Sequence, residues 1–316
     1  MNLNQDFNYQ TLELPDDYEG KVTATLIAAH ANQGKRRSVL YVHGFIDYFF
    51  HPHMAAQFLA HGYDFYALEL RKYGRALMAH QHPNYCRSME EYFPEMTLAL
   101  RQIYQESQHA IILMGHSTGG LSSSLYMNDG AEKKLVNALV LNSPFLALNK
   151  NALLRTFAAP LAKVASSLSP FSKLDGAISP VYGQSVHKNH HGEWDFNLDW
   201  KPIAGFPAYF AWTKAVLEAQ LRLKTHSTIE VPVLVMHASR SFVPKEFTRE
   251  TLTADTVLNV KDIARIGPKL GRQVTMLQIK DAMHDIFLSK KEVREYAFKE
   301  MFRWLDKAVY TKAAYT

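Results

Sequence analysis

Residues 111 to 119 read Ile-Ile-Leu-Met-Gly-His-Ser-Thr-Gly, an apolar run that ends in a serine with a glycine two positions away on each side. The next residues, 120 to 126, continue as a helix-forming stretch. A buried strand that turns through Gly115-x-Ser117-x-Gly119 into a helix has the form of a nucleophile elbow. The glycines permit the tight turn, and the helix N-terminus directs its amides toward the place where an oxyanion would form. We therefore interpret Ser117 as the candidate nucleophile.

Composition bounds the class of protein. The chain has 316 residues, 47% hydrophobic and 21% charged, which suits one large domain with a sizeable insertion. The net charge of +5 is spread along the chain, so we predict no nucleic-acid partner. Cys86 is the single cysteine, which excludes an intramolecular disulfide. The sequence shows neither a signal peptide nor an apolar stretch of roughly 18 residues. We therefore expect a cytoplasmic protein without stable membrane insertion. Peripheral contact with a membrane stays an open possibility.

Strand and helix patterns alternate along most of the chain. Short apolar, β-rich runs lie at residues 23–30, 38–43, 64–70, 111–116, 138–144, 231–237 and 273–279. Helical patterns lie at 54–60, 90–105 and 291–309, the second beginning near Phe93 so that Pro94 falls in its first turn. This alternation predicts an α/β fold with a mainly parallel central sheet flanked by helices.

The alternation stops after Pro144 and returns near residue 231. Between them, residues 150–168 and 207–224 have helical patterns, and residues 170–200 resemble a loop rich in His, Gly and Pro. We predict a core domain formed by residues 1–144 and 228–316, with an inserted helical cap at 145–227. Three aromatic residues of the cap are equally compatible with lining an acyl pocket and with forming a small core of the cap: Trp194, Phe196 and Trp200.

A serine hydroxyl is a poor nucleophile near neutral pH, so it needs a base and a group that orients the base. Among the 15 histidines, His284 follows the last predicted strand in Ala282-Met283-His284-Asp285. In sheets with a nucleophile elbow, the base comes from this position. We predict that His284 is the base.

The acid is harder to assign. It is expected shortly after the strand that ends at His237, yet no carboxylate follows until Glu246, in a stretch that reads as an exposed helix at 244–247. Farther on, Asp255 lies in Thr253-Ala254-Asp255-Thr256-Val257, which has the Asp-x-Val spacing typical of an acid loop. We predict Asp255, displaced by an inserted loop, and keep Glu246 as the alternative.

Two backbone amides are expected to form the oxyanion hole. One belongs to Thr118, directly after the nucleophile; the other belongs to Phe45, because Gly44 lets the chain turn after the strand that ends at His43. The pairs His51-x-His53 and His80-x-His82 resemble fragments of metal sites, but no Asp, Glu or Cys is spaced to complete one. We predict neither a metal ion nor a cofactor.

With these residues in place, the chain resembles the α/β-hydrolases, and more narrowly the serine aminopeptidase-type hydrolases of the lysophospholipase and monoacylglycerol lipase group. The resemblance runs from about residue 20 to 310 and is densest at 42–44, 69–75, 115–120 and 283–285. Two departures stand in the second segment, where Glu69 replaces the usual Asp and Lys72 the usual first Gly. The resemblance implies Ser/Asp/His catalysis without a cofactor.

We therefore expect a serine hydrolase that cleaves a carboxylic ester, lipid-like or small acyl, through an acyl-enzyme. Two alternatives remain open: an amidase or aminopeptidase using the same triad, and a ligand-binding protein that keeps the hydrolase scaffold. An aminopeptidase needs acidic residues for a charged N-terminus, and the cap offers only a few: Glu193, Asp195 and Asp199. The acyl-chain length, the alcohol and the oligomeric state are not readable from the sequence.

Overall fold

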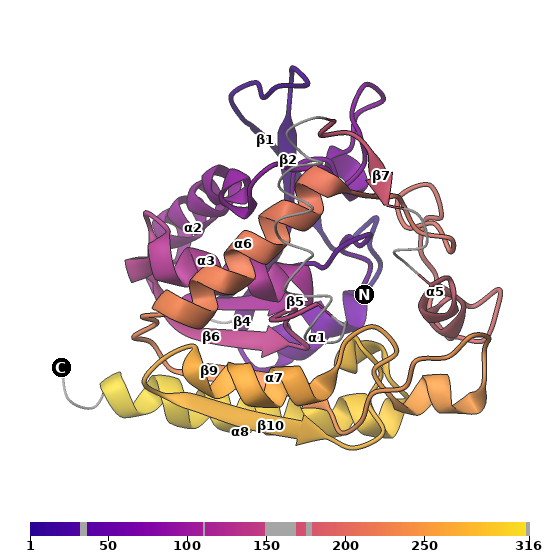
Figure 1. The fold of residues 1–316 in the computed structure, drawn as a ribbon. Helices are drawn as coiled ribbons and strands as arrows, with labels where there is room; N and C mark the ends of the chain where they lie inside the picture. Colours follow the sequence, from indigo (N-terminus) through magenta and orange to yellow (C-terminus); the bar gives the residue numbers. More distant parts are fainter. Residues whose placement is uncertain (32–36, 110, 149–168, 175–178, 314–316) are drawn as a thin grey trace.

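An eight-stranded sheet forms the centre of the protein, as a computed structural model shows for residues 1–31, 37–109, 111–148, 169–174 and 179–313 (Figure 1). The strands follow the order β1-β2-β4-β3-β5-β6-β9-β10 across the sheet. Their bounds are β1 Asn8–Glu13, β2 Thr23–Ala29, β3 Arg37–Val42, β4 Tyr63–Glu69, β5 Ile111–His116, β6 Val136–Asn142, β9 Val233–Ala238 and β10 Val274–Ile279. The predicted α/β class is confirmed.

Pairing is antiparallel at one edge, between β1 and β2 and between β2 and β4, and parallel in every pairing from β4 through β10. Parallel strands end at the same edge of a sheet. The loops that follow β3, β5, β6, β9 and β10 therefore converge at that edge, which is where open α/β sheets carry their sites. All the candidate site residues belong to these loops or to the turn after β5.

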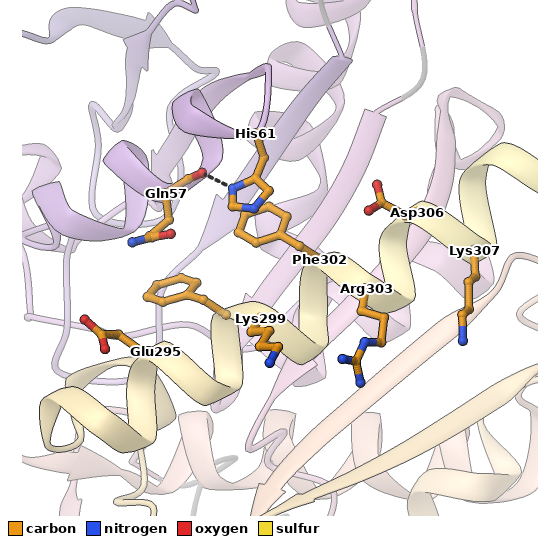
Figure 2. A pocket seen from close by; sticks show the side chains of 9 residues that line it. Gln57, His61, Glu295, Lys299, Phe302, Arg303, Asp306 and Lys307 are labelled. Carbon is orange, nitrogen blue, oxygen red and sulfur yellow. Dashed lines mark hydrogen bonds between the residues drawn. The ribbon is translucent and has the colours of Figure 1, made fainter.

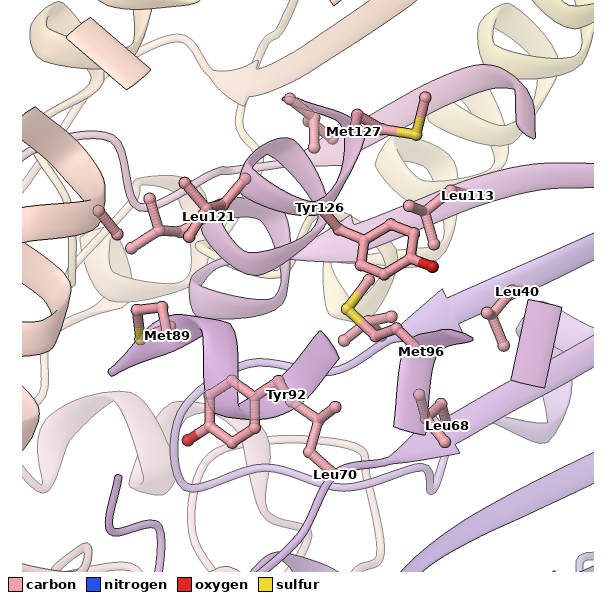
Figure 3. Close-up of a cluster of buried hydrophobic side chains, with 14 of the residues drawn as sticks. Leu40, Leu68, Leu70, Met89, Tyr92, Met96, Leu113, Leu121, Tyr126 and Met127 are labelled. Atoms are coloured by element: carbon pink, nitrogen blue, oxygen red, sulfur yellow. The ribbon is translucent and has the colours of Figure 1, made fainter. Parts of the chain in front are cut away.

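Helices cover both faces of the sheet because the strand residues alternate between them. Along β5, Ile111 and Leu113 join the cluster under α2 Phe93–Ser107, α3 Thr118–Asp129 and α6 Phe210–His226 (Figure 3). Ile112 and Met114 join the opposite cluster, under α1 Pro52–Ala60 and α8 Lys291–Ala313. A shorter helix, α7 Val260–Ile266, lies between β9 and β10. Burial on both faces explains why the strands read as continuous apolar runs.

Several boundaries differ from the predicted ones. The helix expected at 90–105 is α2, which begins at Phe93 with Pro94 in its first turn, after a 3₁₀ helix at Met89–Tyr92. Strand β1 was not predicted, because all but one of its side chains are exposed and give no apolar signal. It is held as an edge strand by its ladder to β2.

Between β6 and β9 the chain leaves the sheet. The described parts of this region contain β7 Lys173–Leu174 paired with β8 Ala208–Tyr209, the short helix α5 Val181–Val186, and α6, which packs against α3. Helix α6 matches the helix expected at 207–224. The expectation of a loop throughout 170–200 is wrong at α5 and β7. The helix expected at 150–168 lies outside the described residues.

No helix in the described ranges combines the length and the apolar character needed to cross a membrane.

Candidate active site

Ser117 lies at a sharp turn between β5 and α3. Its φ of 53° and ψ of −116° are unusual for a residue with a side chain, and such strain persists only where the surroundings hold it. The flanking glycines are required by close packing. A Cβ on Gly115 would lie 2.5 Å from the Gly119 carbonyl oxygen, and a Cβ on Gly119 would lie 2.2 Å from the His43 carbonyl oxygen. The turn at Ser117 therefore packs directly against the end of β3.

The Gly119→Ala variant should lose about 3 kcal/mol or more of its free energy of unfolding, because the added methyl meets fixed backbone atoms. Urea unfolding followed by fluorescence measures the change. Ser124→Ala, which removes a hydroxyl from the same helix and adds no volume, is the control. A Gly119→Ala variant as stable as the wild type would contradict the close approach of elbow and β3.

Of the three residues predicted as a triad, His284 lies within hydrogen-bond distance of each of the other two. His284 Nε2 is 3.0 Å from Ser117 Oγ, and His284 Nδ1 is 2.9 Å from Asp255 Oδ2. A carboxylate only accepts, so Nδ1 carries the proton and the lone pair of Nε2 faces the serine hydroxyl. Asp255 is fully buried and Ser117 is 8% exposed. The arrangement matches the orientation that a general base requires.

The backbone explains how Asp255 reaches this position. A parallel bridge joins Ser241 to Asp255, so that the two ends of the inserted loop meet just beyond β9. The amide of Asp255 donates to the Arg240 carbonyl at 3.0 Å, and Asp255 Oδ1 accepts from the amides of Val257 and Leu258 at 2.8 and 2.7 Å. These hydrogen bonds fix both the backbone and one carboxylate oxygen of Asp255, although the loop before Asp255 is long.

Glu246, the alternative acid, lies in that loop and is exposed. The helix expected at 244–247 is wrong, since the chain forms a bend there and a 3₁₀ helix only at Arg249–Thr253. Charged residues at 245 and 246 can be exposed in a helix as well as in a bend. The sequence pattern therefore could not distinguish these two conformations.

Thr118 directly follows Ser117, and a Cβ on Gly44, the residue before Phe45, would lie 3.1 Å from Ser117 Cβ. Among the described residues, neither the Phe45 amide nor the Thr118 amide donates a hydrogen bond to the protein. The orientation of the Phe45 amide is set by its own peptide unit. His43 Nε2 accepts from the Leu70 amide at 3.1 Å, so His43 Nδ1 carries the proton and donates to the Gly44 carbonyl at 2.8 Å. This carbonyl and the Phe45 N–H belong to one peptide plane.

A second set of buried polar groups lies behind His284. Asn142 Nδ2, at the end of β6, donates to Asp285 Oδ1 at 2.8 Å, and Asp285 Oδ2 lies 3.3 Å from His51 Nε2. Although burial acts in the opposite direction, the imidazoles of His116 and His51 hold the pKa of the Asp285 carboxyl well below its usual range. Neither Asn142 nor Asp285 was predicted to have a role. The signal for Asn142 was a polar residue at the end of a strand beside the predicted site.

Three imidazoles are neutral: those of His43 and His116, which are buried, and that of His53, which is partly buried. Burial lowers the pKa of His43 to about 4, of His116 to about 4 and of His53 to about 3. In the unfolded chain each has a pKa of about 6.5, so the unfolded state binds more protons between pH 6.5 and 4. These groups therefore stabilise the fold above pH 6.5, and that stability is lost as the pH falls.

The free energy of unfolding should fall by up to about 3 kcal/mol between pH 6 and pH 5, with all three histidines contributing. Urea titrations at half-unit pH intervals measure this slope. A free energy of unfolding that stays flat over this range would contradict the assignment of three neutral histidines.

The aromatic residues of the inserted region pack against loops of the sheet domain. Trp194 stacks on His53 at 4.3 Å and its Nε1 donates to the Leu288 carbonyl at 2.9 Å. Phe196 lies 5.1 Å from Phe50, and Trp200 lies edge-on to Tyr48 at 5.3 Å. The sequence left open an acyl pocket or a separate cap core; these contacts instead place the three rings at the junction between the inserted region and the sheet domain.

A surface groove of about 610 Å³ lies between α1 and α8, where His61 stacks on Phe302 at 3.6 Å (Figure 2). His61 precedes the start of β4, so the groove lies near the amino ends of the parallel strands. The candidate site lies at their carboxyl ends. The groove is therefore separate from Ser117.

The sheet order and the elbow after β5 define an α/β hydrolase. The chain belongs to the family described as serine aminopeptidase, S33, whose sequence model matches residues 33–289. No curated protein matches the chain.

Solved structures share the fold at low sequence identity. A soluble variant of monoglyceride lipase from Saccharomyces cerevisiae, in complex with a substrate analog, has a TM-score of 0.69 and 16% identity, over 95% of this chain and 97% of that one. Monoacylglycerol lipase from Paleococcus ferrophilus has a TM-score of 0.63 and 16% identity, over 96% and 100%. A carboxyl esterase from Bacillus coagulans, in complex with glycerol, has a TM-score of 0.68 and 11% identity, over 95% and 99%.

Proposed function

We propose that this protein is a cofactor-independent serine hydrolase that cleaves a carboxylic ester through an acyl-enzyme. The observation that carries the proposal is the continuous line of hydrogen bonds from Asp255 through His284 to Ser117, with distances of 2.9 and 3.0 Å. A buried carboxylate, an imidazole of defined tautomer and a serine at a strained turn are the parts that acyl transfer needs.

In the proposed reaction, Ser117 Oγ attacks the ester carbonyl carbon while its proton passes to His284 Nε2. The carbonyl oxygen becomes an oxyanion, which the amides of Phe45 and Thr118 stabilise. His284 returns the proton to the alcohol oxygen as the C–O bond breaks. Water then attacks the acyl-enzyme with His284 again as base, and the acid leaves. Asp255 stabilises the imidazolium at both stages.

The proposed substrates are lipid-like or small acyl esters. Two observations support this class: solved relatives of the same fold are named as lipases and a carboxyl esterase, and apolar rings border the oxyanion loop. Phe45 itself stacks on Trp212 of α6 at 4.0 Å. A hydrocarbon chain beside these rings would bury apolar surface at no cost in unpaired polar groups.

We also propose that residues 145–227 act as a cap on a core formed by 1–144 and 228–316. The cap would select substrate shape, since it supplies both Trp212 over the oxyanion loop and Tyr182, whose ring lies edge-on to His284 at 5.5 Å. Lids of this kind exclude water and limit what can reach the nucleophile.

An aminopeptidase is less well supported by the acidic residues of the cap. Glu193 pairs with Arg294 at 3.3 Å, and Asp195 pairs with Lys188 at 2.5 Å. Both carboxylates therefore already have a cationic partner at the surface. A free N-terminus would have to compete with these partners.

The proposal is tested by measuring turnover on p-nitrophenyl esters of rising chain length, with a monoacylglycerol, a lysophospholipid and an aminoacyl amide beside them. We expect ester cleavage and labelling of Ser117 by a fluorophosphonate probe. Preferential cleavage of the amide would favour the peptidase. A protein that neither cleaves these substrates nor reacts with the probe would be a binding scaffold instead.

A further inference from the structure

We propose that Lys201, a residue of the inserted region, is a positioning residue that fixes the loop carrying the Phe45 amide. This inference rests on the proposed function and adds to it a specific connection between the cap and the oxyanion hole.

Lys201 reaches from the inserted region into the sheet domain. It follows Trp200 in the segment between α5 and α6, yet its side chain is only 9% exposed. Its Nζ lies 2.8 Å from Asp47 Oδ1 and 3.3 Å from the Ile46 carbonyl oxygen. Burial of an ammonium group is costly without such partners, so the position of Lys201 depends on this loop.

Aromatic rings complete the surroundings of the ammonium group. Phe50, Tyr182 and Phe196 lie with their ring centroids 5.4, 5.9 and 5.6 Å from Lys201 Nζ. Phe50 belongs to the sheet domain, whereas Tyr182 and Phe196 belong to the inserted region. The rings exclude water and favour a cation, so they strengthen the pairing with Asp47 and leave few other partners within reach.

The loop that Lys201 holds is a strained turn. Ile46 has a φ of 51°, which is unfavourable for a β-branched residue. Asp47 Oδ2 lies 3.5 Å from the Gly44 amide, so the same carboxylate spans the turn and pairs with Lys201. Lys201 thus binds the Ile46 backbone and the Asp47 side chain, which belong to the two residues directly after Phe45.

On the side before Phe45, His43 donates a hydrogen bond to the Gly44 carbonyl. The Phe45 peptide unit therefore lies between a neutral imidazole and a buried ion pair. A donor that stabilises an oxyanion must already point at it before charge develops, because reorganisation would cost free energy during the reaction. The pair Lys201–Asp47 supplies this preorganisation from outside the sheet domain.

The electrostatics of Asp47 agree with this arrangement. Burial alone would raise the pKa of Asp47, but Lys201, followed by the neighbouring histidines, outweighs it and holds the pKa below its usual value. Without Lys201 the loop would contain a buried carboxylate with no full positive charge beside it. Such a group either takes up a proton or moves toward water, and the loop would move with it.

The test compares Lys201→Met, which keeps the length of the side chain, with Lys188→Met. Lys188 forms an exposed ion pair with Asp195 in the same region, so its replacement is the matched control. Each variant is assayed on a p-nitrophenyl ester and on the corresponding thionoester. The sulfur of a C=S group is a weak hydrogen-bond acceptor, so thionoester cleavage depends less on the oxyanion amides.

For Lys201→Met we expect kcat on the oxygen ester to fall by about tenfold to a hundredfold, less than for complete loss of an oxyanion donor. KM should change by less than about threefold, and the thionoester should lose much less of its rate. Lys201→Arg should recover part of the oxygen-ester rate, and Lys188→Met should behave as the wild type.

Equal losses on both esters, or a change in KM alone, would show that Lys201 only attaches the cap, and would overturn the inference. If Lys201→Met does not fold, the double variant Asp47→Asn/Lys201→Met removes the charge pair together, and the same fall in the ratio of ester to thionoester rates is required of it. A wild type as inactive as Ser117→Ala would instead overturn the proposed function.

Discussion

A Ser117→Ala variant will fold as the wild type does but will retain less than about a thousandth of its ester turnover. The serine hydroxyl lies 3.0 Å from His284 Nε2 and has no other hydrogen-bond partner among the described residues, so its removal leaves the packing unchanged. The candidate oxyanion amides remain, which accounts for a small residual rate. Steady-state assays combined with a fluorophosphonate titration of active sites measure both the turnover and the loss of labelling.

Ser122→Ala is the matched control, because Ser122 is a buried serine on the same helix, α3, and lies outside the triad. It should keep its turnover and its labelling. A Ser117→Ala variant with more than about a thousandth of the wild-type turnover would remove Ser117 from the role of nucleophile.

The Asp255→Asn variant will lose about three to four orders of magnitude in turnover. An amide at this position can donate to His284 Nδ1, which favours the tautomer whose proton is on Nε2. That proton would face Ser117, and the imidazole could no longer accept from the hydroxyl. The Oδ1 position keeps its hydrogen bonds from the Val257 and Leu258 amides, so the loop should stay in place. Turnover on a p-nitrophenyl ester, with circular dichroism for the fold, measures the effect.

Glu246→Gln removes a carboxylate from the same inserted loop and should change turnover by less than about twofold, because Glu246 is exposed and outside the line of hydrogen bonds. The opposite result, an inactive Glu246→Gln beside an active Asp255→Asn, would mean that the acid loop changes conformation in solution.

The strands of the central sheet other than β1 were predictable because each of them has a strong local signal. The run 111–116 is buried on both faces of the sheet. The glycines at 115 and 119 are needed because an added Cβ would meet backbone atoms at 2.5 and 2.2 Å. The location of His284 beside Ser117 was predictable from its place after the last strand. Position in an alternating pattern was sufficient in both cases.

Asp255 was a different case, since its distance from β9 in sequence is large. The bridge from Ser241 to Asp255 pairs residues that no local pattern connects. The same reasoning covers Lys201 and Asp47, whose pairing spans 154 positions of the chain. Periodicity reports which residues are buried, but not which distant residue faces a buried charge. Strand β1 escaped prediction for the opposite reason, because its exposed side chains show no pattern at all.

The bridge between Ser241 and Asp255 has a practical consequence for protein engineering. Because the two ends of the loop are joined by backbone hydrogen bonds, an insertion at an exposed position between them should not alter where the acid is held. The entropy of closing a loop rises only slowly with its length, so added residues should cost little stability. The stretch around Val243, which is 73% exposed, is therefore a permissive position for a peptide tag or a surface-attachment sequence that leaves turnover intact.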